Sequence, residues 1–363
     1  MSSISKHLFV VLCAMVFLVG ALAGCGAPGG KDAGDGRAAQ GKAELIPINL
    51  GCIQTTGSVL YFVALEEGFF KDEGLDASLH FFTNAGEGIN ALIAGKLDIG
   101  AFGTAPPLNF IARGQDIVMF GGHAGEGHAV VAMPEKAAGL KTLKDYRGKN
   151  VATVRMATGD IVWRYGLKNA GIDWRKDLTI KELESPSAVL EAVRSGSVDA
   201  GVIWSPYRTM AEDRGMKIVL QSGQVPGMEG HTCCRQITMK GYMEKNPDIA
   251  LKFMRAIIRA YDFFKTNKEK TMEDIAKYIQ IDMRVIEIET YGPYINDSPE
   301  PNAKAISHFW DAMREIGYIE SDIDIKDHIN VDVFKKALDE LIREYPGNTN
   351  YQELQAQFEQ NRL

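Results

Sequence analysis

A ten-residue pattern is present twice in the chain and limits the folds that the sequence can adopt. Residues 91–100 read ALIAGKLDIG, and residues 192–201, which lie 101 positions later, read AVRSGSVDAG. Each copy predicts an amphipathic helix that ends at a glycine, a residue suited to the left-handed conformation at a helix C-terminus, and an apolar strand that begins at the aspartate. Upstream, residues 48–51 and 151–154 form a second matching pair of short apolar segments. The sequence therefore predicts a molecule built from two similar units.

Strands and helices alternate in both predicted units, which is typical of α/β folds in which helices cover both faces of a parallel sheet. A chain of 363 residues has room for two domains. We therefore expect two doubly wound lobes that face each other across a cleft. In each unit a strand runs into a small polar residue and a proline, Thr104 with Pro106 and Ser205 with Pro206. Ligands bind at such strand ends in open α/β sheets.

The charge balance excludes one class of partner. The chain has 40 Lys and Arg residues against 47 Asp and Glu residues, which gives a formal net charge of -7. Binding to nucleic acid requires clustered basic side chains that neutralise phosphates, and the sequence has no such cluster. No nucleic acid is therefore expected as a partner.

The N-terminal segment predicts export. Residues 8–22 form an apolar run with the length of a signal-peptide core, shorter than the roughly 20 residues that span a bilayer. The run ends in Leu-Ala-Gly-Cys at 22–25, which resembles the lipobox of bacterial lipoproteins, so Cys25 is the expected site of lipidation. Residues 26–44 are rich in Gly, Ala and charge and predict a flexible tether. The expected location is the periplasmic or extracytoplasmic face of the cell membrane, with the lipid as the only anchor.

These features together resemble a known family. The lipobox and the paired Gly-x-apolar-Asp-x-Gly elements are similar to those of the type II solute-binding lipoproteins of ATP-driven importers, in the group that takes aliphatic sulfonates, taurine, nitrate and pyrimidine precursors of thiamine. The resemblance covers about residues 45–332, and its most specific segments are 68–75, 95–106 and 198–207. It implies the periplasmic-binding-protein type II fold, with two doubly wound lobes and C-terminal helices packed on the first lobe.

The resemblance also implies a domain order in which the chain crosses between the lobes twice. The expected crossover strands are 129–133 and 233–239. The expected parts are a signal peptide at 1–24, the lipidated cysteine and tether at 25–44, the first lobe at 45–133, the second lobe at 134–223, the return to the first lobe and C-terminal helices at 224–345, and a polar C-terminal tail at 346–363.

The C-terminal third predicts helices. Asn246 and Pro247 form a favourable helix start, and Ile249, Phe253, Ile257 and Tyr261 recur after them at helical spacing. We interpret this stripe as an apolar face packed on the first lobe. Further helices are predicted at 302–316, 331–342 and 351–360, the last of them polar and partly frayed.

Hydroxyl-rich turns at two helix starts predict an anion site. Thr55, Thr56 and Gly57 follow the first strand, and Thr158 with Gly159 follow the equivalent strand of the second unit. Backbone amides and hydroxyls at a helix N-terminus bind the oxygens of anions, helped by the positive end of the helix dipole. The alternative is that the threonines only cap their helices.

Other candidates extend this site. Trp204 offers an apolar wall for the ligand, or else fills the core of its lobe. His128 lies next to a crossover and is either a ligand contact or a solvated loop residue. Arg235 is the natural counter-ion of an acidic ligand. Asp160 would repel an anion, so it either turns to solvent or meets an amine of the ligand. The predicted ligand-binding residues are Gln54, Thr55, Thr56, Thr83, Gly103, Thr104, His128, Thr158, Gly159, Asp160, Trp204 and Arg235.

Five cysteines are present. Cys13 is expected to leave with the signal peptide and Cys25 to carry lipid, which leaves Cys52, Cys233 and Cys234 as reduced, buried, small apolar residues. Two alternatives remain, a disulfide between Cys52 and Cys233 and a soft-metal cluster of these cysteines with His128 and His231. The spacing matches no recognised zinc pattern, so no metal is expected.

The sequence has no recognised catalytic motif. We therefore expect no enzymatic activity and no cofactor. The expected function is that of a solute-binding lipoprotein of an ABC-type importer, a monomer that captures a small organic solute such as a sulfonate or carboxylate between its lobes. Its expected partners are the permease and the ATPase of the importer. The alternatives are a thiamine-pyrimidine-precursor-type enzyme on the same fold and a solute-sensing subunit of a signalling system.

Overall fold

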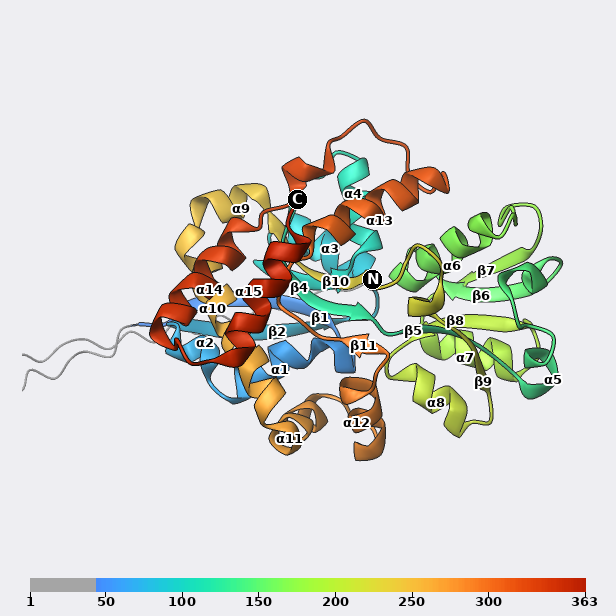
Figure 1. Cartoon of the computed structure of the whole chain (residues 1–363), viewed down its shortest axis with the longest axis horizontal. Coiled ribbons are helices and arrows are strands. Elements are labelled where there is room, and N and C mark those ends of the chain that lie inside the picture. Colours follow the sequence, from blue (N-terminus) through green and yellow to red (C-terminus); the bar gives the residue numbers. More distant parts are fainter. Residues whose placement is uncertain (1–43) are drawn as a thin grey trace, which may run out of the picture. The chain divides into compact units, whose positions relative to one another are not determined.

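The computed structural model describes residues 44–363 (Figure 1). The predicted signal peptide, Cys25 and all of the predicted tether except Glu44 lie outside the described residues. Within residues 44–363, none of the helices combines the length and the apolar composition that a bilayer-spanning segment needs.

Two separate β-sheets organise the described chain. The first has six strands in the order β11-β4-β10-β3-β1-β2, and the second has five in the order β7-β6-β8-β5-β9. We call the part built on the first sheet, residues 44–126 and 232–363, the first lobe, and residues 128–221 the second lobe. The strands are β1 (Ile46–Ile53), β2 (Leu75–Phe82), β3 (Ile99–Gly103), β4 (Ile117–Glu126), β10 (Thr232–Met239) and β11 (Ile295–Asn296) in the first sheet, and β5 (His128–Ala132), β6 (Asn150–Val154), β7 (Thr179–Leu183), β8 (Ala200–Trp204) and β9 (Lys217–Gln221) in the second.

Each sheet combines a parallel part with an antiparallel part. β1 is parallel to β2 and β3, and β6 is parallel to β7 and β8, as strands joined through helices require. β10 is antiparallel to β3 and β4, and β5 is antiparallel to β8 and β9. The predicted α/β class is confirmed, but the sheets are mixed, because β5 and β10 are the strands that enter each lobe from the other.

The aspartates of the repeated pattern hold equivalent positions in the two lobes. Asn49 N donates to Asp98 Oδ2 at 2.7 Å, and Asp98 N donates to Asn49 O at 2.9 Å. Asn150 and Asp199 repeat both bonds, at 2.9 Å and 2.7 Å. Each aspartate therefore fixes the start of its strand against the neighbouring strand. The repeat read from the sequence corresponds to one structural unit present in both lobes.

Glycines end the two helices that the pattern predicted. α3 (Ala85–Ile93) is followed by Gly95 with φ of 69°, and α7 (Pro186–Arg194) is followed by Gly196 with φ of 72°. A residue with a side chain is strained in this left-handed region, whereas glycine is not. The same conformation at Gly68, with φ of 77°, separates the two helices that follow β1.

These two helices are α1 (Val59–Glu66) and α2 (Phe69–Asp72). The side chains from Val59 to Ala64 are fully buried, because α1 contacts α10 (Pro247–Thr266), α11 (Lys268–Tyr278) and α2. The other helices of the first part of the first lobe and of the second lobe are η1 (Thr56–Ser58), α4 (Ala105–Ala112), α5 (Pro134–Ala137), η2 (Leu143–Tyr146), α6 (Thr158–Asn169) and α8 (Tyr207–Asp213), and η3 (Ser222–Gln224) follows the second lobe.

The chain changes sheets at positions that differ from the expected ones. β4 ends at Glu126 and β5 begins at His128, so the first crossing is the single residue Gly127. The expected crossover strand 129–133 lies mostly in β5, within the second sheet, and the expected strand 233–239 lies in β10, within the first. The chain returns through residues 222–231, between β9 and β10. The lobe boundary thus precedes residue 133, because the positive φ of 82° at Gly127 turns the chain directly into β5.

The C-terminal part is helical, and its stripe packs on the first lobe. Phe253, Ile257 and Tyr261 of α10 are buried, as the spacing predicted. The Asn246 side chain does not cap α10 and donates instead to Tyr242 O. The remaining helices are α9 (Lys240–Lys245), α12 (Met283–Tyr291), α13 (Ala303–Glu315), η4 (Ile325–His328), α14 (Asp332–Glu344) and α15 (Thr349–Asn361).

Two features of these helices differ from the prediction. The helix predicted at 351–360 as polar and partly frayed is α15, which extends from Thr349 to Asn361, with Tyr351, Leu354 and Phe358 buried against α10, α13 and α14. In addition, α12 contacts α8 and α13 contacts α6, so C-terminal helices contact both lobes.

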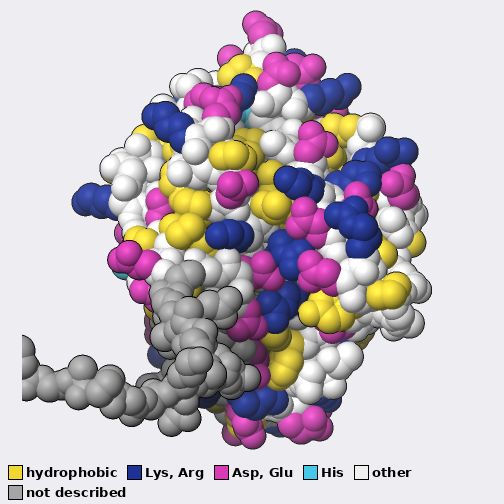
Figure 2. Space-filling model, turned by 90° about the vertical axis from the view of Figure 1, so that its left-hand side faces the viewer, with side chains coloured by type: hydrophobic (Ala, Val, Ile, Leu, Met, Phe, Trp, Pro, Cys, Tyr) yellow, Lys and Arg dark blue, Asp and Glu magenta, His cyan; other side chains and the backbone are white. Residues whose placement is uncertain are grey.

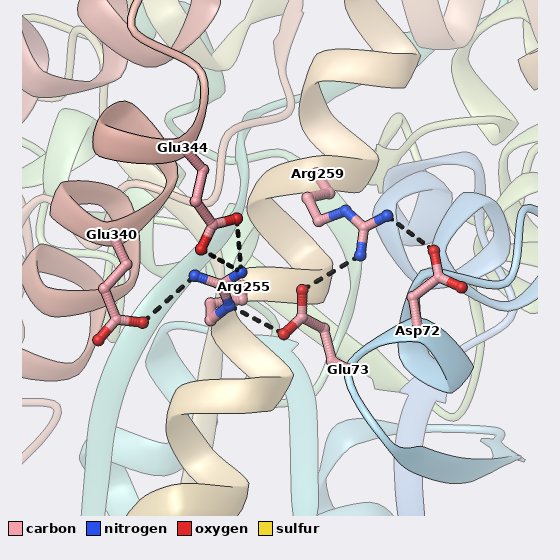
Figure 3. A network of polar contacts seen from close by, with 6 residues as sticks. All are labelled: Asp72, Glu73, Arg255, Arg259, Glu340 and Glu344. Carbon is pink, nitrogen blue, oxygen red and sulfur yellow. Dashed lines mark hydrogen bonds and ion pairs between the residues drawn. The ribbon is translucent and has the colours of Figure 1, made fainter. Parts of the chain in front are cut away.

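Two arginines of α10 hold the helices of the first lobe together (Figure 3). Arg255 pairs with Glu73 at 2.8 Å, Glu340 at 3.2 Å and Glu344 at 3.0 Å. Arg259 pairs with Asp72 at 2.7 Å and Glu73 at 3.1 Å. The network connects the end of α2, α10 and α14. On this side of the lobe, acidic and basic side chains alternate over the surface (Figure 2).

Candidate functional site

A cleft of about 260 Å³ lies between the two lobes. Both lobes contribute to its wall, and most of the lining is apolar, with Ile53, Pro106 and Ile295 from the first lobe facing Val154, Leu183 and Trp204 from the second. The polar part comes from glycines, from short side chains, and from three charged residues, Glu126, Arg155 and Glu184. This matches the expected position of a ligand site at the carboxyl ends of strands.

Five of the twelve predicted ligand residues line the cleft, namely Thr55, Gly103, His128, Thr158 and Trp204. Thr55 and Gly103 come from the first lobe, and the other three come from the second. Trp204 is half-buried, and it both lines the cleft and packs against the core of the second lobe. The same side chain therefore lies both at the cleft and against the core of its lobe.

The other seven predicted residues do not line the cleft. Gln54 and Thr83 are exposed, and Gln54 Nε2 donates to the carbonyl of Tyr278. Thr56 and Thr104 are fully buried, and Thr104 Oγ1 bonds to Thr232 Oγ1 at 3.1 Å. The remaining three are Gly159, Asp160 and Arg235, which lie behind the wall.

Asp160 turns into the second lobe. Its Oδ1 pairs with Arg164 Nε at 2.8 Å, and both side chains are buried. Burial raises the pKa of the Asp160 carboxyl, while the Arg164 charge acts in the opposite direction. Neither of the two expected orientations, toward solvent or toward the ligand, is adopted. The ion pair removes the conflict that we expected between Asp160 and an anion.

Arg235 is buried behind Ala124, which lines the cleft. Its Nη1 donates to Glu300 O and its Nη2 to Ala124 O, both at 3.4 Å, and Nε has no partner within the described chain. Burial lowers the pKa of Arg235 to about 10, and the side chain stays charged at neutral pH. Arg235 therefore adds positive potential near the cleft without contacting it.

Four helices begin at the cleft. Thr55 precedes the η1 segment that leads into α1, Asn84 caps α3, Gly103 and Pro106 flank the start of α4, and Thr158 begins α6. Free amides and positive dipole ends at helix starts favour anions. The start of α4 offers no free amide, because Thr104 N and Ala105 N donate to Cys233 O and Thr158 Oγ1 and the next two residues are prolines. Since α6 belongs to the second lobe and η1 and α3 to the first, an anion in the cleft would meet helix starts from both lobes.

Thr158 joins the two lobes at this point. Its Oγ1 donates to Cys233 O at 3.2 Å and accepts from Ala105 N at 3.3 Å, and both partners belong to the first lobe. A Cβ atom at Gly103 would lie 2.8 Å from Thr158 Oγ1, so only glycine fits there without a shift. The Thr158 hydroxyl thus bridges the lobes instead of capping its own helix.

His128, His231 and Cys233 form a directed chain of contacts at one wall of the cleft. Burial lowers the pKa of His231 to about 4 and that of His128 well below its usual value, so both rings are neutral at pH 7. His231 Nδ1 lies 2.8 Å from Met228 O and must donate to it, which leaves Nε2 as an acceptor for His128 Nδ1 at 3.5 Å. His128 Nε2 then accepts from the Cys233 thiol, at 3.6 Å from Sγ.

None of the described cysteines forms a disulfide bond. Cys52, Cys233 and Cys234 are free thiols, so the disulfide considered between Cys52 and Cys233 is not formed. Cys52 is fully buried, whereas Cys233 and Cys234 are partly exposed at the cleft, with their Sγ atoms 3.2 Å apart. Over residues 44–363, no group of three or more His, Cys, Asp and Glu side chains is arranged to hold a metal ion.

Glu289 is an important residue that the sequence did not reveal. It lies on α12, is fully buried, and accepts hydrogen bonds from Ser205 Oγ at 2.6 Å and from Thr209 N at 2.8 Å at the start of α8. Arg208 Nη1 lies 3.4 Å from the same carboxylate. A single glutamate in a helix of mixed composition carries no pattern that would distinguish it from a solvated residue.

Known proteins are similar to this chain over both lobes. The model of the NMT1-like family matches residues 41–280. A Bacillus subtilis protein provisionally named as an aliphatic sulfonates-binding protein is 27% identical over 343 residues, which cover 92% of this chain and 98% of the relative.

Two solved structures show the same fold. The periplasmic aliphatic sulphonate binding protein SsuA of Escherichia coli has a TM-score of 0.68 and 21% identity, over 80% of this chain and 99% of that one. The periplasmic nitrate-binding protein NrtA of Synechocystis has a TM-score of 0.70 and 16% identity, over 82% and 89%. The expected two-lobe fold is confirmed.

Proposed function

We propose, because this chain belongs to the NMT1-like family, that it is the solute-binding component of an ABC-type importer and captures a small organic anion in its cleft. The relative in Bacillus subtilis and SsuA are named for sulfonates, and both cover most of this chain. The proposed ligand is a sulfonate or carboxylate with a short apolar body. The proposed partners are the permease and the ATPase of the importer.

The observation that carries this proposal is the set of helix starts from both lobes at one cleft. Backbone amides and Thr55 supply uncharged donors, Arg155 lines the cleft, and Arg235 adds a charge from behind the wall. The apolar residues around them suit an alkyl or aromatic body. A volume of about 260 Å³ restricts the ligand to a small molecule, since sites for drug-sized ligands measure roughly 300–1,000 Å³.

Binding works through closure of the lobes. A ligand that contacts both lobes binds the closed arrangement more tightly than the open one. This difference in binding free energy sets how far the ligand shifts the population toward the closed arrangement. Thr158 and Glu289 supply bonds between elements of different lobes, so closure and ligand binding support each other. The permease then distinguishes the closed form from the open one.

We propose binding without chemical turnover. Cys233 and His128 are in contact, but the Cys234 contact and burial raise the pKa of the Cys233 thiol well above its usual value, while burial lowers that of His128. Both shifts keep the proton on sulfur, the reverse of the thiolate–imidazolium pair that makes a cysteine a nucleophile. We also propose that the chain is a monomer anchored at the extracytoplasmic face by lipid on Cys25.

Calorimetry with matched ligands tests the proposed function. Titration of the purified chain with butanesulfonate, butanoate and butylamine compares two anions with a cation of equal apolar size. We expect binding of an anion, an increase of the melting temperature, and a smaller radius of gyration in solution scattering. Tighter binding of butylamine than of both anions would contradict the anion site. The lack of compaction with every ligand bound would contradict the closure mechanism.

A further inference from the structure

Two adjacent thiols on the wall of the cleft have no role in the function proposed above. In a regular strand, neighbouring residues point to opposite faces of the sheet. Here Thr232 pairs with Gly125 and Cys234 with Ala124, so Cys233 is an additional residue without a partner on β4, a β-bulge. As a result, both cysteines line the cleft.

The bulge is held in place from both lobes. Cys233 O accepts from Thr104 N at 2.7 Å and from Thr158 Oγ1 at 3.2 Å. The proton of the Cys233 thiol is directed to His128 Nε2, while Sγ lies 3.2 Å from Sγ of Cys234. The two sulfurs are therefore positioned next to each other, on the cleft side, next to a neutral imidazole that accepts a proton.

We propose that Cys233 and Cys234 form a chelating site in the cleft for a trivalent arsenical, either arsenous acid or its monosubstituted organic form. Two sulfurs in contact match what trivalent arsenic requires, because it takes two thiolates on one side and keeps a third position for an organic group or hydroxide. The arsenical is neutral before and after binding, which suits a wall that contains the neutral His128 and is mostly apolar. This inference does not depend on the identity of the organic solute.

The geometry favours this ligand over the two other uses of a dithiol. Structural zinc takes four protein ligands and catalytic zinc three, whereas the described residues offer no group of three metal-binding side chains here. A disulfide needs Cα atoms about 4.4–6.8 Å apart, whereas adjacent residues are held at about 3.8 Å. A chelate through arsenic separates the sulfurs by one more atom and avoids this strain.

The binding step is a condensation without any redox change. Two As–S bonds form and two As–OH bonds break, and each hydroxide leaves as water with the proton of one thiol. The hydrogen bond to His128 Nε2 orients the Cys233 thiol, whose proton passes to the departing hydroxide as the sulfur bonds to arsenic. Arsenic stays trivalent, and both cysteines keep their oxidation state. The bound arsenical occupies the cleft and ends the contact between Cys233 and His128.

Phenylarsine oxide, which is phenylarsonous acid in water, tests the site on the reduced full-length chain. The readouts are the mass of the intact protein and the alkylation of each cysteine by iodoacetamide, mapped on peptides. We expect one arsenical per chain, protection of Cys233 and Cys234, and no protection of Cys52. A small dithiol should reverse the binding, and a monothiol at the same concentration should not.

Single substitutions distinguish a chelate from separate thiols. Chelation gains about 100-fold or more in affinity from the second bond, so Cys233→Ser and Cys234→Ser should each weaken binding by at least about 100-fold. Cys52→Ser is the matched control and should bind like the parent chain. Cys234→Ala provides a second test if Cys233→Ser unfolds.

Several outcomes would overturn the proposal. One is binding to Cys233→Ser as tight as to the parent chain. Another is protection of Cys52 instead of the pair. A third is loss of alkylation at Cys233 and Cys234 with no arsenic mass gained, which would identify a disulfide. A fourth is protection of the pair by Zn²⁺ at a lower concentration than the arsenical requires, which would identify a metal site. None of these outcomes bears on the binding of sulfonates or carboxylates.

Discussion

Single residues decide how closely the lobes approach each other. The absence of a side chain at Gly103 leaves the space that the Thr158 hydroxyl occupies, and this hydroxyl bonds to Ala105 N and Cys233 O across the cleft. The sequence marked Gly103 and Thr158 as separate ligand contacts. Their dependence on each other is visible only in three dimensions, because they lie in different lobes.

Gly103→Ala should weaken solute binding about 10-fold, since its Cβ would lie 2.8 Å from Thr158 Oγ1 and hold the lobes apart. In a Thr158→Ala background the same substitution should cost much less, because the clash is gone. Calorimetric titration of the four variants gives the coupling. Gly241→Ala is the control, as a Cβ there meets no atom within 4 Å. Equal effects of Gly103→Ala in both backgrounds would refute the coupling.

The sequence predicted residue types better than side-chain directions. The aspartates at 98 and 199 and the glycines at 95 and 196 were predictable, because their roles are local and repeated. Asp160 could not be placed, because its direction depends on Arg164 one helical turn later and on the burial of both.

Individual elements differ from the prediction where tertiary contacts overrule local pattern. The helix predicted at 351–360 was expected to be polar and partly frayed, yet α15 runs from Thr349 to Asn361, because three of its side chains reach the core of the first lobe. A few apolar residues at helical spacing are enough when a neighbouring helix is there to receive them. The break between α1 and α2 also depends on a single residue, Gly68, whose φ is positive.

α12 joins the lobes through Glu289, so Glu289→Gln should lower the free energy of unfolding by about 3 kcal/mol. The substitution leaves Arg208 without its buried counter-ion and replaces an acceptor that three donors need. Urea unfolding measures the change. Glu287→Gln on the same helix removes only an exposed pair with Lys268 and should cost less than about 0.5 kcal/mol. Equal costs for both variants would contradict the role of Glu289.

The arginine network of α10 should likewise stabilise the folded chain, through contacts within the first lobe. Arg255→Met removes the shared partner of Glu73, Glu340 and Glu344, which leaves three carboxylates close together, and should destabilise the chain by about 2 kcal/mol. Thermal unfolding measures the loss. Arg194→Met, at an exposed pair with Glu191 on α7, is the matched control and should have almost no effect.

The whole molecule follows from the repeat, but the contacts between its lobes do not. Two copies of one unit predicted two lobes with a cleft at their strand ends, and that arrangement is observed. The C-terminal helices that contact the second lobe do so through residues such as Glu289 and Glu315, which bonds to Lys168. These are ordinary polar helix residues far along the chain, and no local pattern reveals their partners.

Stability of the whole chain should fall as the pH decreases below about 6.5. A histidine whose pKa is lowered on folding stays neutral while the unfolded chain takes up a proton, so its stabilising contribution is full above the unfolded pKa of about 6.5 and is lost toward the folded pKa. The pKa of His231 in the folded chain is about 4, so its protonation on unfolding lowers the free energy of unfolding by up to about 3 kcal/mol at low pH. Burial also lowers the pKa of His128 and that of His123.

Chemical unfolding of the parent chain and of His231→Gln between pH 7 and pH 4 tests this dependence. The variant lacks one of the groups that protonate on unfolding, so its free energy of unfolding should fall less steeply over that range. His80→Gln, at an exposed position, is the control. Identical slopes for His231→Gln and the parent chain would contradict the assignment.

The two connections between the lobes are unequal, because Gly127 alone joins β4 to β5 whereas residues 222–231 join β9 to β10. The shorter connection is a single backbone position, whereas the longer one is held by the buried side chains of Val225 and Met228. We expect an opening movement to rotate about a point near Gly127, with the largest travel at the rim farthest from it. The side of the cleft by which a solute enters is then set by the placement of a single glycine.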